Sequence, residues 1–203
     1  MSAEHKRDRR ARWRWVAVGI AAVVAGGLAG SVVAGQFDDG SNLVAAIEDT
    51  PLHRVADVPA GDGTAEKGVF AESTSTGHLC VWEASSATAR DRSGGCNTAD
   101  DPLNGHPLSF TLGYDGGPDI ASVKSASLFG LAAPDVAQAT VLMTDGTERA
   151  VKLKRVKLGS DEYRAFGFRF KKSDLRRGIG PAAVIALDAS GVEIDRQATG
   201  IGS

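Results

Sequence analysis

An uncharged apolar run directly follows a basic N-terminus in this chain of 203 residues. The run covers residues 15–37 and contains no Asp, Glu, Lys, Arg or His. A helix rises about 1.5 Å per residue, so roughly 20 apolar residues cross the hydrocarbon core of a bilayer. The run is long enough for this, and it predicts a transmembrane helix that decides on which side of a membrane the rest of the chain folds.

The charges on either side of the run predict its orientation. Six Lys and Arg residues lie within residues 1–14, whereas Asp38 and Asp39 follow the run. Because basic flanks stay on the cytoplasmic side, we expect a single-pass membrane protein with a cytoplasmic N-terminus and an extracytoplasmic C-terminal domain. A cleaved secretory signal is the alternative, with a passable cleavage site at residues 32–34. Apolar regions of such signals usually span about 7–15 residues, so the longer run favours an uncleaved signal-anchor.

Small residues recur at every fourth position on one face of the predicted helix. They are Ala22, Gly26, Gly30 and Ala34. This spacing lets two helix backbones approach closely, which would allow a homodimer through the membrane. The whole run is rich in Ala and Gly, so the same spacing also arises by chance, and both interpretations stay open.

The sequence divides into four segments. A cytoplasmic basic tail covers residues 1–14, and the transmembrane signal-anchor covers 15–37. Residues 38–66 are polar and punctuated by Pro and Gly, which predicts an extracytoplasmic stalk or linker. Residues 67–203 are long enough for one domain with a core of its own.

The chain has two cysteines, Cys80 and Cys96, and both follow the predicted span. Compartments outside the cytoplasm permit disulfides, so we expect these two residues to be bonded to each other. A structural zinc site would need four ligands, and a catalytic thiol would need a histidine partner. Neither requirement is met near these cysteines.

From residue 67 the hydrophobic pattern has a period of two, which is typical of β-strands. Residues 108–112 alternate, and residues 139–143 lead through Asp145-Gly146 into a second strand, as in a β-hairpin. No amphipathic helical pattern of ten or more residues appears. Eight or nine short strands separated by turns predict an all-β fold, an antiparallel β-sandwich.

Several short motifs resemble those of exported, membrane-anchored actinobacterial β-sandwich proteins of unknown function. They are Cys80 with Gly95-Cys96, Gly130-Leu131, Asp135-Val136, residues 139–143, Asp145-Gly146, Phe168, Ala186-Leu187-Asp188 and Gly191. The resemblance covers about residues 68–196 and implies export and an immunoglobulin-like C-terminal half. It implies no activity, because none is established for that family.

One basic block stands in an otherwise acidic exported chain. Residues 149–177 carry 11 basic and 3 acidic side chains, whereas residues 36–148 carry 5 basic and 17 acidic ones. Clustered cations attract phosphates and carboxylates, so the block is a candidate anion-binding patch. Its alternative role is to solvate sheet edges, where Lys prevents aggregation. The candidate residues are Lys152, Lys154, Lys171, Lys172, Arg176 and Arg177.

No catalytic, metal-binding or cofactor motif is present in the sequence, which contains neither HExxH nor GxSxG. We therefore expect a non-enzymatic interaction or accessory module of the cell envelope, with no cofactor and no metal. The partners expected are the membrane and an anionic envelope polymer or an acidic protein. Nucleic acid is not expected, because the exported part is acidic. The alternative is an envelope hydrolase whose active site the sequence does not reveal.

Overall fold

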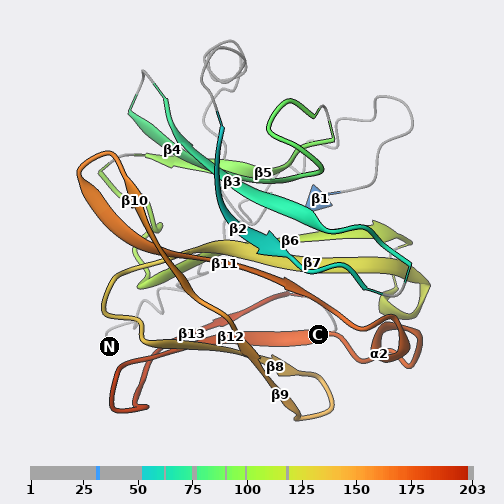
Figure 1. The fold of residues 1–203 in the computed structure, drawn as a ribbon. Helices are drawn as coiled ribbons and strands as arrows, with labels where there is room; N and C mark the ends of the chain where they lie inside the picture. Colours follow the sequence, from blue (N-terminus) through green and yellow to red (C-terminus); the bar gives the residue numbers. More distant parts are fainter. Residues whose placement is uncertain are drawn as a thin grey trace, which may run out of the picture.

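The computed structural model describes residues 31–32 and 52–200, apart from residues 62, 75, 76, 90, 99 and 118. Within these residues the chain forms three antiparallel β-sheets stacked in layers (Figure 1). The all-β antiparallel class predicted from the sequence is confirmed. A sandwich has two layers, whereas the chain has three, so one sheet is covered on both faces.

The upper sheet contains four strands in chain order. They are β2 (His53–Val58), β3 (Lys67–Ser73), β4 (His78–Ala84) and β5 (Ser93–Thr98). Each strand pairs with the next one along the chain, so this sheet is a simple meander.

The central sheet has the order β1-β6-β7-β11-β10. Its strands are β1 (Ser31–Val32), β6 (Leu108–Gly116), β7 (Val123–Ala132), β11 (Asp161–Arg169) and β10 (Lys154–Leu158). The 3-10 turn η1 (Ile120–Ser122) connects β6 to β7.

The lower sheet has the order β13-β12-β8-β9. Its strands are β13 (Glu193–Ala198), β12 (Pro181–Leu187), β8 (Gln138–Met143) and β9 (Glu148–Val151). The short helix α2 (Lys172–Arg176) follows β11 and places Leu175 in the core between the central and lower sheets.

Strand β7 divides the interior into two cores. Leu128 on one face packs into the core shared with the lower sheet, whereas Phe129 and Leu131 on the other face pack into the core shared with the upper sheet. All residues from 126 to 132 of β7 are buried. Successive side chains of a strand point to opposite faces, so a strand that is buried at every position must be covered on both sides. This is why a third layer forms.

The predicted stalk is wrong at its C-terminal end, because residues 53–58 form β2 and belong to the upper sheet. Val55, Ala56 and Val58 are buried against the central sheet. A bulge between Arg54 and Ala56 places two neighbouring residues on the buried side. The bulge interrupts the period-two pattern by which a strand is recognised in a sequence.

The N-terminal predictions fall almost entirely outside the described residues. These predictions are the basic tail, most of the span and the small-residue face of Ala22, Gly26, Gly30 and Ala34. Residues 31–32 of the predicted span are described, and they form β1 opposite Gly113 and Leu112 of β6, which differs from the helix predicted there. Among the helices that the structure describes, none has the length and apolar character needed to cross a membrane.

Candidate functional site

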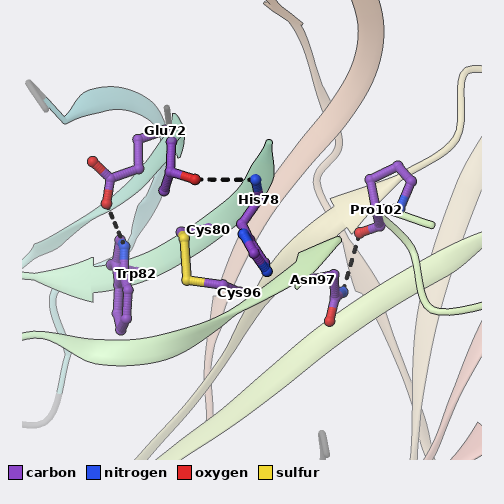
Figure 2. Close-up of a disulfide and its surroundings, with 8 residues drawn as sticks. Glu72, His78, Cys80, Trp82, Cys96, Asn97 and Pro102 are labelled. Atoms are coloured by element: carbon purple, nitrogen blue, oxygen red, sulfur yellow. Dashed lines mark hydrogen bonds between the residues drawn. A yellow bond between two sulfur atoms is a disulfide. The ribbon is translucent and has the colours of Figure 1, made fainter. Parts of the chain in front are cut away.

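The predicted disulfide is confirmed, and it joins two neighbouring strands of the upper sheet (Figure 2). Cys80 in β4 and Cys96 in β5 are register partners whose Cα atoms lie 3.9 Å apart. Cys80 is completely buried, whereas Cys96 is partly exposed on β5, the edge strand of its sheet. Cys96 is therefore the more accessible half of the disulfide.

Glu72 lies directly opposite Cys80 on β3, so that Glu72, Cys80 and Cys96 form one row across three strands. Only 1% of Glu72 is exposed. Its Oε1 accepts a hydrogen bond of 3.1 Å from the indole N–H of Trp82 (Figure 2). Among the described residues, its Oε2 is the only buried side-chain nitrogen or oxygen without a hydrogen-bond partner. A buried polar atom of this kind calls for an explanation.

Burial raises the pKa of Glu72 above the ordinary carboxyl value, because desolvation penalises the charged form. The hydrogen bond from Trp82 and the positive charge of Arg92 lower this pKa, but by less than desolvation raises it. Arg92 is held in place by its hydrogen bond of 3.1 Å to the carbonyl of Ala89. The environment of Glu72 thus shifts its titration towards the neutral acid.

The side chain of Trp82 packs against Gly94 on the neighbouring strand β5. Trp82 is two residues after Cys80 on the same face of β4 and is register partner of Gly94. A Cβ atom at Gly94 would lie 2.9 Å from Cε3 of the Trp82 ring and 2.0 Å from the carbonyl oxygen of Val81. Only glycine fits there, so the Trp82 ring packs directly against the backbone of β5.

A second buried carboxylate, Glu83, lies on the opposite face of β4 and points to the central sheet. Its Oε2 accepts a hydrogen bond of 2.6 Å from the hydroxyl of Ser127 in β7. Its Oε1 lies 3.6 Å from Nζ of Lys67 and 3.9 Å from Nη2 of Arg169. Arg169 also donates a hydrogen bond of 2.7 Å to the carbonyl of Pro59. We call Glu83, Ser127, Lys67 and Arg169 the inter-sheet polar cluster, because it connects two layers.

The six cations of the predicted anion-binding patch fall into two groups. Lys152 follows β9, and Lys154 begins β10 opposite Ala165 of β11. Lys171 follows β11, six residues after Ala165. At about 3.3 Å per strand residue, the backbone of Lys154 is therefore roughly 20 Å from that of Lys171. Lys152 is three residues after Arg149, whose Nη2 lies close to the carboxylate of Asp174 in α2. The separation of Lys154 from Lys171 exceeds the Debye length of about 8 Å at physiological salt, so these two ends of the basic block are screened from each other.

The four cations at α2 do lie together. Lys171, Lys172, Arg176 and Arg177 occupy the helix and the residues beside it. The buried Asp174 holds one side of this group, because its carboxylate lies 2.8 Å from Nη2 of Arg177 and 3.6 Å from Nη2 of Arg149 in β9. We call the four residues the α2 cation group.

Neither Glu72 nor the inter-sheet polar cluster was predicted from the sequence. One signal was available for Glu72, which follows Val69, Phe70 and Ala71 without a break. On a strand with one exposed face, polar residues alternate with apolar ones. The three apolar residues before Glu72 break this alternation, which indicates that both faces of the strand are covered there. Nothing in the spacing of Glu83, Ser127 and Arg169 shows that they meet, because they come from strands far apart in the sequence.

Within the part of the chain that the structure describes, no three His, Cys, Asp or Glu side chains are grouped so that they could hold a metal ion. Comparison with protein-family models, with curated proteins and with solved structures found no match to the chain. The functional argument therefore rests on the residues and their geometry.

Proposed function

We propose that this chain is a membrane-tethered module that is exposed outside the cytoplasm and acts by binding an anionic partner. The basic tail and the apolar run at residues 15–37 support the tether and its orientation. The Cys80–Cys96 disulfide supports the compartment, because disulfides persist outside the reducing cytoplasm. Both features support an extracytoplasmic location for the three sheets.

The observation that carries the binding role is the α2 cation group. Four cations on and beside one five-residue helix contrast with residues 36–148, where 17 acidic side chains outnumber 5 basic ones. Such an arrangement attracts an anionic ligand to this end of the molecule. An anionic polymer of the cell envelope fits this chemistry.

The test is a comparison of two variants with equal changes in charge. In the first, Lys171, Lys172, Arg176 and Arg177 are replaced by Ser. In the matched control, the four cations at β10 are replaced instead: Lys152, Lys154, Arg155 and Lys157. Binding of the full chain, in detergent, to polyphosphate as a soluble anionic polymer is measured at increasing salt.

Each exposed charge pair contributes about 0.2–1 kcal/mol. Removal of the α2 cation group should therefore weaken binding about tenfold or more at low salt. The β10 control should bind as the parent does, and parental binding should weaken as salt rises. If both variants lose the same affinity for polyphosphate, binding depends only on net charge, and the α2 cation group is not the binding site.

Three finer points belong to the same proposal. The three strands β6, β7 and β11 face the lower sheet over one core, which supports an immunoglobulin-like C-terminal half. An acidic protein is the alternative partner, and its binding would show the same dependence on the α2 cation group. Dimerisation through Ala22, Gly26, Gly30 and Ala34 stays a prediction.

A further inference from the structure

The row of Glu72, Cys80 and Cys96 combines features that a purely structural disulfide does not need. Directly opposite residues on antiparallel strands have Cβ atoms roughly 4.5–5.5 Å apart, a distance that a glutamate side chain spans. Glu72 and Cys80 therefore lie side by side on one face of the sheet, with the carboxyl group of Glu72 turned to Trp82 (Figure 2). One carboxyl oxygen is fixed by Trp82, and the other is buried and unpartnered.

We propose that Glu72 and the Cys80–Cys96 disulfide form a site of proton-coupled thiol–disulfide exchange. In this site, Glu72 supplies the proton to Cys80 when the thiolate of an external thiol opens the disulfide. The substrate class is a thiol, either a small molecule or a cysteine of another protein.

The exposure of the two sulfurs sets the direction of attack. The external thiolate attacks Sγ of the partly exposed Cys96, forming a mixed disulfide with it. The Cys80–Cys96 bond breaks, and its electron pair remains on Sγ of the buried Cys80. The proton of the neutral Glu72 carboxyl group then moves to this sulfur, leaving a thiol and a carboxylate. A second external thiolate attacks the external sulfur of the mixed disulfide and releases Cys96, which takes a proton from water.

The balance is one protein disulfide reduced to two thiols and two external thiols oxidised to one disulfide. Glu72 recovers its proton from water, so it is not consumed. In the reverse reaction, the Glu72 carboxylate removes the proton from the Cys80 thiol and generates the attacking thiolate. Glu72 is the proton carrier in both directions.

Proton transfer from Glu72 is favoured because of where the negative charge ends. A thiolate at the completely buried Cys80 would be an uncompensated charge in an apolar environment. A carboxylate at Glu72 receives the hydrogen bond from Trp82 and the attraction of Arg92. A carboxylic acid is also the stronger acid, with an ordinary pKa near 4.5 against about 8.5 for a thiol.

Few other ionisable groups face Glu72. From the loop before β5 comes Arg92, and on the same face of β4 lies His78, two residues before Cys80. On the β2 side the next position in register is the apolar Leu52, and β5 offers only Cys96 among groups able to ionise. The titration of Glu72 therefore depends mainly on burial, Trp82 and Arg92.

The test uses the oxidised full chain in detergent and glutathione as the thiol. The rate constant of disulfide opening is measured from pH 5 to about 9 and divided by the thiolate fraction of glutathione. In the wild type this corrected rate constant should fall as pH rises through the titration of Glu72, because the carboxylate has no proton to give. In Glu72→Gln it should be independent of pH and about tenfold or more below the wild-type acid limit.

The control is Glu66→Gln, which removes an exposed carboxylate close to β3 and should leave the wild-type profile unchanged. If the wild type and Glu72→Gln share one profile and one rate, the proposal is wrong.

A second measurement needs no variant and covers the case in which Glu72→Gln does not fold. The carboxyl ¹³C signal of Glu72 is titrated in the oxidised and in the reduced wild type. The oxidised protein should give one step, and the reduced protein two coupled steps shared with Cys80. Identical single-step curves in the two states would overturn the proposal.

Discussion

Replacing Glu83 by Gln should strongly destabilise the fold, because the inter-sheet polar cluster depends on its charge. Glu83 is 2% exposed, and the side chain of its cationic neighbour Arg169 is 9% exposed. Gln has almost the same shape and can still accept the hydrogen bond from Ser127. Its neutral side chain, however, leaves the guanidinium of Arg169 buried without a counter-charge.

The magnitude follows from what Arg169 retains. Removing one partner of a buried ion pair costs about 3–5 kcal/mol when the other is left without compensation. Arg169 keeps its hydrogen bonds to the carbonyls of Pro59 and Ala65. The side chain of Lys67 is one-third exposed, so water can solvate its charge when Glu83 is neutral. We therefore expect a loss of about 2–4 kcal/mol in the free energy of unfolding.

The assay is urea unfolding of the oxidised protein at pH 7, with the slope checked for equality between variants. Glu66→Gln serves as the control, because its ion pair with Arg54 is exposed and should contribute less than about 1 kcal/mol. Ser127→Ala should cost about 1–3 kcal/mol by itself. The double variant should lose less than the sum of the two single losses, since both act on one cluster. A loss at Glu83 no larger than that of the control would refute the reasoning.

Three further predictions follow from the upper sheet. Gly167→Ala should lower the free energy of unfolding by more than about 1 kcal/mol, because the added Cβ would lie 2.4 Å from the carbonyl oxygen of Asp57 in β2. Urea unfolding measures this loss, and an unchanged midpoint would contradict the packing of β2 on β11. Replacing both Cys80 and Cys96 by Ala should cost about 2–4 kcal/mol in the same assay, and a negligible change would contradict a stabilising disulfide. The raised pKa of Glu72 means that the folded state binds its proton more tightly, so the free energy of unfolding should fall as pH rises from near 4.5 through the folded-state pKa. Glu72→Gln should remove this dependence in thermal unfolding, and a dependence that persists would count against the burial argument.

The all-β class and most strand positions could be predicted because a half-buried strand has a visible period of two. Strands β6 and β8 were predicted close to their observed positions. The Asp145-Gly146 turn between β8 and β9 was also predicted, and Gly146 has the positive φ of 80° that favours glycine. These strands and this turn are determined by residues close to one another in the sequence, so the sequence pattern alone reveals them.

Two strands of the upper sheet, and with them one layer, were missed for physical reasons. β5 has the sequence Ser-Gly-Gly-Cys-Asn-Thr, whose glycines make room for Trp82 and leave almost no apolar alternation to detect. In β2 the bulge after Arg54 breaks the alternation. Without these two strands the upper sheet was not apparent, and the apolar run of β7 was interpreted as one strand of a sandwich. A strand buried on both faces has that same appearance.

The disulfide could be predicted from compartment and count, but the groups around it could not. The pairing of Glu72 with Cys80 depends on the register of β3 and β4. A shift of one residue would move the carboxyl group to the other face of the sheet. The division of the basic block has a similar origin, because the distance between Lys154 and Lys171 depends on the pairing of β10 with β11.

The most direct test of the central claim, a disulfide-bonded module tethered outside the cytoplasm, is labelling of a Ser41→Cys variant in intact cells. Both native cysteines are bonded to each other, so the introduced thiol is the only one free to react. A membrane-impermeant maleimide should modify it without lysis, on a protein whose mass retains residues 1–37. Modification only after lysis would contradict the proposed location, and a mass lacking the N-terminal segment would contradict the tether.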